Sequence, residues 1–504
     1  MSRKETFFKH ITEGYKTKGK SLIFGSAILD GETIKDAFVK VPLKTLNRHG
    51  LIAGATGTGK TKSLQVMAEN LSENGIPVLL MDIKGDLSGL AKASPGHPKI
   101  DERHAAIGLP FDAKKFPVEI LTISEQEGTR LRATISEFGP VLLSRIMDLT
   151  EAQSGIVSII FKYCDDNKLP LLDLKDFKKI LQFATDEGKE ELQREYGRIS
   201  SMSTGAILRK LVELEQQGGD LFFGERSFDV QDLVRQDEDG KGIISILRLT
   251  DIQDRPKMFS TFMLQLLAEV YSTFPEQGDS GQPELVIFID EAHLIFKEAS
   301  KALLSQIESI VKLIRSKGVG LFFVTQNPKD VPEDVLAQLG LKVQHALRAF
   351  TAKDRKAIKL ASENYPDSEY YDVDETLTQL GIGEAFVSAL NEKGIPTPLA
   401  ATMMRAPMSR MDVLSPTELK SQIENSRLYY KYNETIDRES AYEILNDKIE
   451  QINDKEEVEK KKKAVSKSKS SSSRSSSTRM NPILKVVTSA TFIRGVLGIL
   501  KRVI

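Results

Sequence analysis

Residues 54–61 read Gly54-Ala55-Thr56-Gly57-Thr58-Gly59-Lys60-Thr61, and this stretch decides the fold. It matches the phosphate-binding loop pattern G-x-x-x-x-G-K-[ST] at every fixed position, between an apolar stretch at 51–53 and a helix-like run at 63–71. Glycines let the backbone wrap around an anion, and N–H groups at a helix start point toward it. We therefore expect a nucleotide site in which Lys60 contacts the β- and γ-phosphates and Thr61 holds Mg²⁺. An ordinary βα turn is the alternative.

An acidic pair supplies the second half of this site. Asp290 and Glu291 directly follow the apolar strand expected at 285–289, at the sheet edge where open α/β folds bind ligands. We expect Asp290 to hold Mg²⁺ through water and Glu291 to polarise the attacking water. A strand-end helix cap is the alternative. Asp82 and Asp86, near the end of another strand, fit either a metal- or nucleic-acid-contacting loop or a polar turn.

Further polar residues are candidates for a role in phosphoryl transfer. Gln326 ends the strand expected at 321–325 and can sense the γ-phosphate or orient the water, although a plain turn also fits. An arginine that stabilises the spreading charge is worth roughly 10³–10⁵ in rate. Arg315 and Arg348 are candidates for this arginine finger, and a surface arginine explains each equally well. His293 is assigned no catalytic role.

Composition limits the other function classes. The chain has 504 residues, 40% hydrophobic and 28% charged, so two or three domains are expected. Its single cysteine, Cys164, excludes an internal disulfide framework and a cysteine-built metal site, and buried packing is its expected role. The N-terminus has no signal-peptide pattern, and no run of 18 apolar residues occurs. We therefore expect a cytoplasmic protein.

The order of apolar runs predicts an α/β fold with a mainly parallel sheet flanked by helices. Strands are expected at 76–82, 118–123, 242–247, 285–289, 321–325 and 343–349, and hairpins from 21–25 with 37–41 and from 386–389 with 398–401. The predicted organisation is an N-terminal β element (1–45), a nucleotide-binding core in two parts (46–140 and 236–408), a helical insertion (141–235), a C-terminal helical region (409–454), a disordered Lys/Ser linker (455–481) and an amphipathic helix (482–504).

Several motifs occur in a specific order: residues 48–61, 81–87, 290–293, and 315–320 running into 324–328. As a set they resemble the HerA/FtsK branch of P-loop ATPases, most closely bacterial HerA-like proteins of the YjgR type. The resemblance covers roughly residues 20–405. It implies a RecA-like core of the additional-strand, catalytic-glutamate class, and a ring, often hexameric, with ATP and Mg²⁺ at subunit interfaces.

The resemblance also implies roles for individual residues. It assigns the phosphate, Mg²⁺, catalytic-carboxylate and polar-sensor positions to Lys60, Thr61, Asp290, Glu291 and Gln326. Arg348 falls where relatives place an arginine that acts on the neighbouring subunit's nucleotide. Only a β element of about 45 residues precedes the nucleotide-binding core, whereas HerA itself has a fuller N-terminal β-barrel, and the helical insertion and basic tail also depart from that pattern.

The functional prediction is an ATP-hydrolysing ring that translocates on DNA. The net charge of −1 gives no global basic surface, so DNA contact would depend on a few channel cations. A nucleotide-gated assembly or regulatory protein and a secretion- or conjugation-type ATPase are the alternatives. The terminal helix at 482–504 is expected to dock on the protein itself, with a membrane surface as the alternative.

Overall fold

The computed structural model describes residues 2–252, 255–278, 281–297, 301–349, 351–434, 436 and 438–467. A 12-stranded sheet forms its centre, in the order β2-β1-β12-β11-β10-β3-β9-β8-β4-β7-β5-β6. The strands are β1 (Ser21–Leu29), β2 (Glu32–Pro42), β3 (Gly50–Ala53), β4 (Val78–Asp82), β5 (Val118–Thr122), β6 (Thr129–Arg130), β7 (Ile244–Arg248), β8 (Leu285–Ile289), β9 (Val319–Thr325), β10 (Leu341–His345), β11 (Glu384–Ser388) and β12 (Ala400–Met404). The α/β prediction is confirmed.

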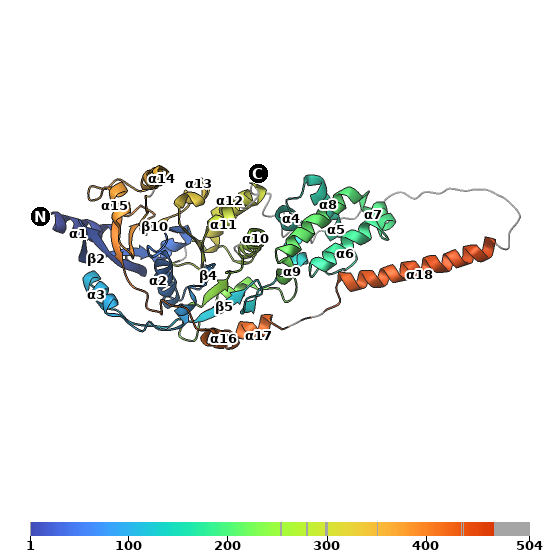
Figure 1. Ribbon diagram of the computed structural model, residues 1–504, viewed down its shortest axis with the longest axis horizontal. Coiled ribbons are helices and arrows are strands. Elements are labelled where there is room, and N and C mark those ends of the chain that lie inside the picture. Colours follow the sequence, from blue (N-terminus) through green and yellow to red (C-terminus); the bar gives the residue numbers. More distant parts are fainter. Residues whose placement is uncertain are drawn as a thin grey trace.

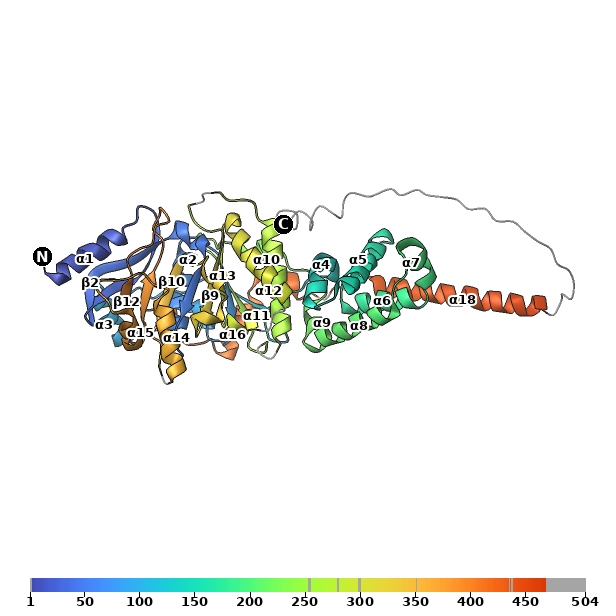
Figure 2. The same ribbon diagram turned by 90° about the horizontal axis from the view of Figure 1, so that it is seen from above.

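Strands β10 through β6 run parallel, and both of their faces are buried. Strand β4 illustrates why its sequence is continuously apolar: Leu79 and Met81 join one core cluster, whereas Val78 and Leu80 join the cluster on the other face. Helices cover these faces (Figures 1 and 2). They include α2 (Lys60–Glu73), α10 (Pro256–Thr273), α11 (His293–Lys297), α12 (Lys301–Ile314) and α13 (Glu333–Leu336).

The position of β9 in the sheet brings the parts of the site together. Strand β9 lies between β3 and β8, with Ala53 aligned with Thr325 and Ile289 aligned with Phe323. This inserted strand matches the additional-strand class that the resemblance implies. Because the three strands are parallel, the residues that follow each of them emerge at one edge of the sheet.

The other end of the sheet is antiparallel. The β1–β2 hairpin turns at Asp30 and Gly31 and pairs through β1 with β12, and β11 and β12 form the second expected hairpin. The N-terminal β element therefore extends the central sheet. Strand β10 ends at His345, short of the expected 349, because the chain then turns and Ala346 O accepts the Ala55 N–H. Helices α1 (Arg3–Gly14), α3 (Pro98–Ile107), α14 (Ala352–Ser362) and α15 (Val373–Gln379) cover this end.

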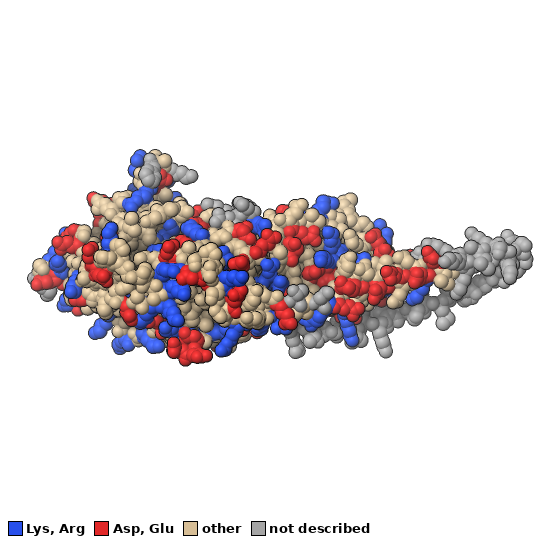
Figure 3. Space-filling model, turned by 60° about the horizontal axis from the view of Figure 1, so that its bottom comes forward, with Lys and Arg blue, Asp and Glu red and all other residues tan. Residues whose placement is uncertain are grey.

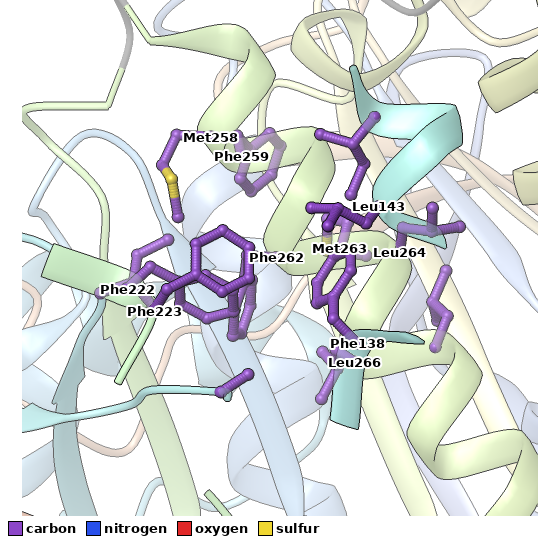
Figure 4. Packing of buried hydrophobic residues seen from close by; sticks show 14 of the residues in the cluster. Phe138, Leu143, Phe222, Phe223, Met258, Phe259, Phe262, Met263, Leu264 and Leu266 are labelled. Atoms are coloured by element: carbon purple, nitrogen blue, oxygen red, sulfur yellow. The ribbon is translucent and has the colours of Figure 1, made fainter. Parts of the chain in front are cut away.

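A bundle of helices lies at the end of the molecule opposite the N-terminus (Figure 1). It consists of α4 (Ile135–Ile146), α5 (Glu151–Asp166), α6 (Leu174–Thr185), α7 (Lys189–Tyr196), α8 (Ser201–Gln216) and α9 (Gly219–Phe222). Apolar side chains from α4 and from the end of α9, including Phe138 and Phe222, lie against α10, which contributes Phe262 (Figure 4). Cys164 is buried in this bundle, as expected. We call residues 135–222 the insertion.

The C-terminal region is helical for longer than the sequence predicts. Helices α16 (Pro416–Glu424) and α17 (Arg427–Tyr432) precede α18 (Ala441–Lys467), which lies against the insertion and then projects beyond it (Figure 1). The linker prediction at 455–481 is therefore wrong for 455–467. Leu445 is buried against the insertion, and the Lys- and Glu-rich residues that follow are good helix formers.

Residues 468–504, which include the predicted amphipathic helix, lie outside the described part of the chain. None of the helices formed by the described residues has the length and apolar character needed to cross a bilayer.

Candidate nucleotide site

The phosphate loop joins the end of β3 to the start of α2. Gly54 and Gly59 have positive φ values of 151° and 114°, a region that favours glycine. A Cβ on Gly54 would come within 2.5 Å of the His345 Cβ, and one on Gly59 within 3.1 Å of the Gly383 N. The loop is therefore packed closely from behind, and its backbone has little freedom to move away from an anion bound in front.

Lys60 begins α2 and is buried. Its Nζ donates to Gly54 O at 2.7 Å and to Ala55 O at 3.0 Å, so the ammonium lies inside the loop. Burial lowers its pKa and the nearby Lys84 adds to this effect, while Glu291 and Asp290 oppose it. The charges of Lys60 and of the acidic pair therefore influence each other, although these residues are more than two hundred positions apart in the sequence. Thr61 follows in the first turn of α2.

The acidic pair lies directly beyond β8, and both carboxylates are buried. The Glu291 N–H donates to Asp290 Oδ1 at 2.9 Å. Burial raises the pKa of Asp290 to about 7, against the opposing charge of Lys84, so this carboxyl favours a nearby cation. Glu291 has a φ of 45°, which is uncommon for a non-glycine residue and typical of functional sites.

Gln326 connects the two halves of the site. It follows β9, and its Nε2 lies 3.4 Å from Glu291 Oε1, while its Oε1 accepts from Thr56 Oγ1 at 3.3 Å. One side chain therefore spans from the phosphate loop to the catalytic-carboxylate candidate. The predicted site residues Lys60, Asp290, Glu291 and Gln326 lie together at one edge of the sheet.

Lys84, a residue with no predicted role, lies against Glu291. Its Nζ lies 2.7 Å from Glu291 Oε1, on the loop after β4. Burial opposes ionisation of Glu291, but Lys84 and Gln326 keep the pKa of this carboxyl below its ordinary value. The sequence shows that Lys84 stands two residues beyond a strand, but it does not show that this strand pairs with β8.

Two histidines also contact the site. His293 Nδ1 lies 3.3 Å from Glu291 Oε2. That oxygen accepts no well-aligned hydrogen bond, so the contact is electrostatic when the ring is charged. His345 is fully buried behind the phosphate loop, where Nε2 contacts Ser63 Oγ at 2.9 Å and Nδ1 contacts Glu384 O at 2.9 Å. His345 was not among the predicted site residues, because nothing in the local sequence distinguishes it from a strand-end polar residue.

Asp82 has a structural task in this arrangement. Its carboxylate accepts the N–H groups of Gly85, Asp86 and Leu87 at 2.7–3.2 Å, which fixes the loop after β4. Burial raises the pKa of Asp82 to about 6, with Asp86 adding to the effect. Of the two interpretations left open, the polar turn accounts for the contacts of Asp82.

The two candidate arginines lie at opposite edges of the sheet. Arg348 follows β10 at the edge of the phosphate loop, is exposed, and donates to Thr378 O at 3.0 Å. Arg315 precedes β9, at the amino-terminal edge, where its charge helps burial to lower the pKa of His49. The structure therefore brings Arg348, and not Arg315, to the edge of the sheet that carries the phosphate loop.

A family described as Helicase HerA-like C-terminal matches residues 28–495 of the chain. The match includes the phosphate loop, the acidic pair and the insertion.

Individual relatives are more distant. The chain is 22% identical over 384 residues to the DNA double-strand break repair helicase HerA of Sulfolobus acidocaldarius, covering 74% of this chain and 68% of the relative. Against the protein of the same name from Saccharolobus solfataricus, identity is 25% over 364 residues, covering 70% and 64%. The chain thus spans about two thirds of the length of these relatives.

A solved structure with a related fold is the plasmid coupling protein TrwB in complex with a non-hydrolysable ATP analogue. The TM-score is 0.51 at 16% identity, covering 80% of this chain and 94% of that chain. A sulphate complex of TrwB gives a TM-score of 0.51 at 15% identity, covering 80% and 94%. At such identities the likeness shows the fold alone.

Proposed function

The chain belongs to the HerA-like helicase C-terminal family, and from this premise we propose that it hydrolyses ATP to drive movement along DNA. One observation carries the proposal: Gln326 contacts both Thr56 of the phosphate loop and Glu291 of the acidic pair. This contact supports a single site that binds a triphosphate and activates water beside it.

Each residue has a task in this proposal. The loop N–H groups and Lys60 bind the phosphates, and Lys60 exchanges its contacts with Gly54 O and Ala55 O for phosphate oxygens. Glu291 accepts a hydrogen bond from the attacking water, and Gln326 orients that water. These tasks follow from the position of each group at one sheet edge.

The residues present fit Mg²⁺. This ion usually keeps several waters and takes one or two carboxylates plus substrate phosphates, rather than a protein cage. Asp290 and the hydroxyl of Thr61 are such a donor set. No group of three or more His, Cys, Asp or Glu side chains in the described ranges could enclose a metal. When bound, Mg²⁺ neutralises charge on the phosphates.

DNA and a ring are the remaining parts of the proposal. Two observations support them. The relatives are described as helicases, and Arg348 lies at the edge of the phosphate loop. Exposed on the nucleotide edge, Arg348 is available to a neighbouring subunit's nucleotide. Positive and negative side chains alternate on the face shown in Figure 3, which offers no broad basic patch for a duplex. The proposal therefore assigns DNA contact to a few cations brought together by assembly, and not to this face.

The test is the rate of ATP hydrolysis with no DNA, single-stranded DNA and double-stranded DNA, alongside the mass of the particle with and without ATP. We expect DNA-stimulated hydrolysis, an ATP-dependent ring mass, and no turnover in Lys60→Ala. A hydrolysis rate that neither form of DNA changes would contradict the proposed movement along DNA, but not the proposed ATPase activity. A failure of the wild-type protein to hydrolyse ATP would contradict both.

A further inference from the structure

A groove opens where the insertion meets the helices that cover the sheet. It lies between α4, α10 and α12, which neighbour one another in both views (Figures 1 and 2), and its volume is about 220 Å³. Its lining is mainly apolar, with Phe138, Val141 and Leu142 from α4 and with Ile310 and Leu313 from α12. Val141, Leu142 and Leu313 are only partly buried, so apolar surface stays in contact with water. Covering this surface with another apolar segment would be favourable.

The polar groups of the groove are mainly hydrogen-bond acceptors. Gln265 Nε2 donates to Glu269 Oε2 at 3.0 Å, but Gln265 Oε1 is buried and accepts no hydrogen bond from the described residues. Burial raises the pKa of Glu269, and the charges of Glu137 and Asp229 add to this effect. Among the described residues that line the groove, Arg145 is the one cation, against the carboxylates of Glu137 and Glu269. The groove therefore favours an occupant that combines apolar side chains with positive charge.

The chain itself contains a segment of this kind. Residues 482–504 include no Asp or Glu, and their charged residues are Lys485, Arg494, Lys501 and Arg502. Apolar residues recur there every three or four positions, as on one face of a helix, at Val486, Ala490, Ile493, Leu497, Leu500 and Ile504. We call these six residues the apolar stripe. The segment thus matches the groove both in apolar surface and in charge.

The chain that connects α18 to this segment is long enough to bring it to the groove. Helix α18 has 27 residues, or about 40 Å at 1.5 Å per residue, and its first turns lie against α6 of the insertion. The roughly 14 residues at 468–481 can span up to about 46–50 Å when they are extended. They can therefore return along the whole length of α18, and a helix over 482–504 would add ~35 Å of reach.

We propose that residues 482–504 of this chain lie in the groove between α4, α10 and α12, with the apolar stripe against Leu142 and Leu313 and a lysine or arginine beside Glu269. In this position the segment joins the insertion to helices of the nucleotide-binding core. The proposal concerns an interaction surface, and it does not depend on ATP hydrolysis.

Cross-linking between introduced cysteines tests this contact in the full-length chain. Cys164 is buried, so a short bis-maleimide reacts mainly with the introduced cysteines. We expect Gln306→Cys with Leu497→Cys to cross-link within one chain several-fold faster than Met202→Cys with Leu497→Cys, because Gln306 lines the groove whereas Met202 lies on α8. Equal rates for the two pairs would overturn the proposal. Faster cross-linking between two chains that carry one cysteine each would overturn it in favour of a second copy.

A second measurement needs no cysteine. Hydrogen exchange of the α4 amides is compared between wild type and Leu497→Asp, with Leu497→Met as the conservative control and α1 as the internal reference. We expect several-fold faster exchange of α4 in Leu497→Asp, because a charge in the apolar stripe empties the groove, and no change in α1. Unchanged exchange of α4 in Leu497→Asp would overturn the proposal. Wild-type protein that floats with vesicles of anionic phospholipid would also overturn it, since the apolar stripe would then be free to bind a membrane.

Discussion

Buried carboxylates have different surroundings at the nucleotide edge and in the insertion. Asp176 in the insertion accepts hydrogen bonds from the N–H groups of Leu172, Asp173 and Tyr442, and from Ser440 Oγ. Glu291 at the nucleotide edge has one oxygen without a well-aligned donor, and cations lie nearby. A buried carboxylate whose oxygens all accept hydrogen bonds stabilises a fold. A buried carboxylate that has an oxygen without a hydrogen-bond donor, and cations nearby, is typical of a ligand-binding site.

The largest effect is expected at the nucleotide edge in an assembled ring. Arg348→Ala should lower kcat by about 10³-fold or more, because an arginine finger contributes roughly that much. Arg315→Ala, at the opposite sheet edge, should stay within a few-fold of wild type. Steady-state hydrolysis measures both. Mixed rings of Arg348→Ala and Lys60→Ala subunits should regain activity if the arginine acts across the interface, and equal losses in the two arginine variants would contradict this assignment.

Replacing one carboxylate of each kind by the corresponding amide tests the comparison between the nucleotide edge and the insertion. Glu291→Gln should lower kcat by about 10²–10⁴-fold while ATP still binds, because the general base is lost. Single-turnover hydrolysis and equilibrium binding separate these effects.

Asp176→Asn is the matched control. It should lower the free energy of unfolding by about 1–3 kcal/mol, because donors to the carboxylate lose their partner, and leave kcat unchanged. A loss of turnover in Asp176→Asn with a stable fold would show that the insertion takes part in chemistry.

In the insertion, removing a buried apolar side chain should lower the free energy of unfolding more than removing a charge. Phe177 is completely buried there, so Phe177→Ala should cost about 3–5 kcal/mol of stability without changing ATP affinity in the protein that remains folded. Denaturant unfolding measures the change. Met202→Ala, at a side chain 85% exposed on α8, should have almost no effect. Similar losses for both would mean that the insertion core is not packed as described.

Acid should remove the stability that buried, neutral histidines contribute to the body, whereas the insertion has no histidine contribution to lose. Burial lowers the pKa of His345 to about 4, so this ring is neutral in the folded protein at pH values where the unfolded one is protonated. Its stability contribution is complete above about pH 6.5 and is lost as the pH falls toward 4. His345→Gln should reduce the slope of unfolding free energy in that window by up to ~1.4 kcal/mol per pH unit.

Residues 135–222 contain no histidine, so an acid transition of the insertion in the same window would contradict this account. His49 is a control at the opposite edge, because burial also lowers its pKa to about 4. His49→Gln should flatten the slope without affecting nucleotide binding.

Much of the nucleotide edge could be predicted from sequence, because its chemistry follows local patterns. The phosphate loop and Asp290-Glu291 each stand directly after an apolar run, and parallel strands bring such ends together. Lys84 and His345 could not be assigned in this way, since their roles depend on which strands are neighbours. That information lies in the order β10-β3-β9-β8-β4, which no single segment encodes.

The remaining differences have similar causes. The sequence did contain the signal for α1, since Ser2 and Glu5 form a capping box ahead of Phe7 and Ile11, but we predicted no helix there. The extension of α18 depends on its packing against the insertion as well as on composition. Low complexity alone suggested disorder at 455–467, whereas the helix that begins at Ala441 continues through these residues.

The most direct test of the central claim is a structure of Glu291→Gln bound to Mg²⁺ and ATP. We predict that the triphosphate contacts the loop and Lys60 while the same ion lies within reach of both Thr61 and Asp290, directly or through one water. A bound nucleotide whose ion is far from Asp290, or whose phosphates lie outside residues 54–61, would contradict a single shared site.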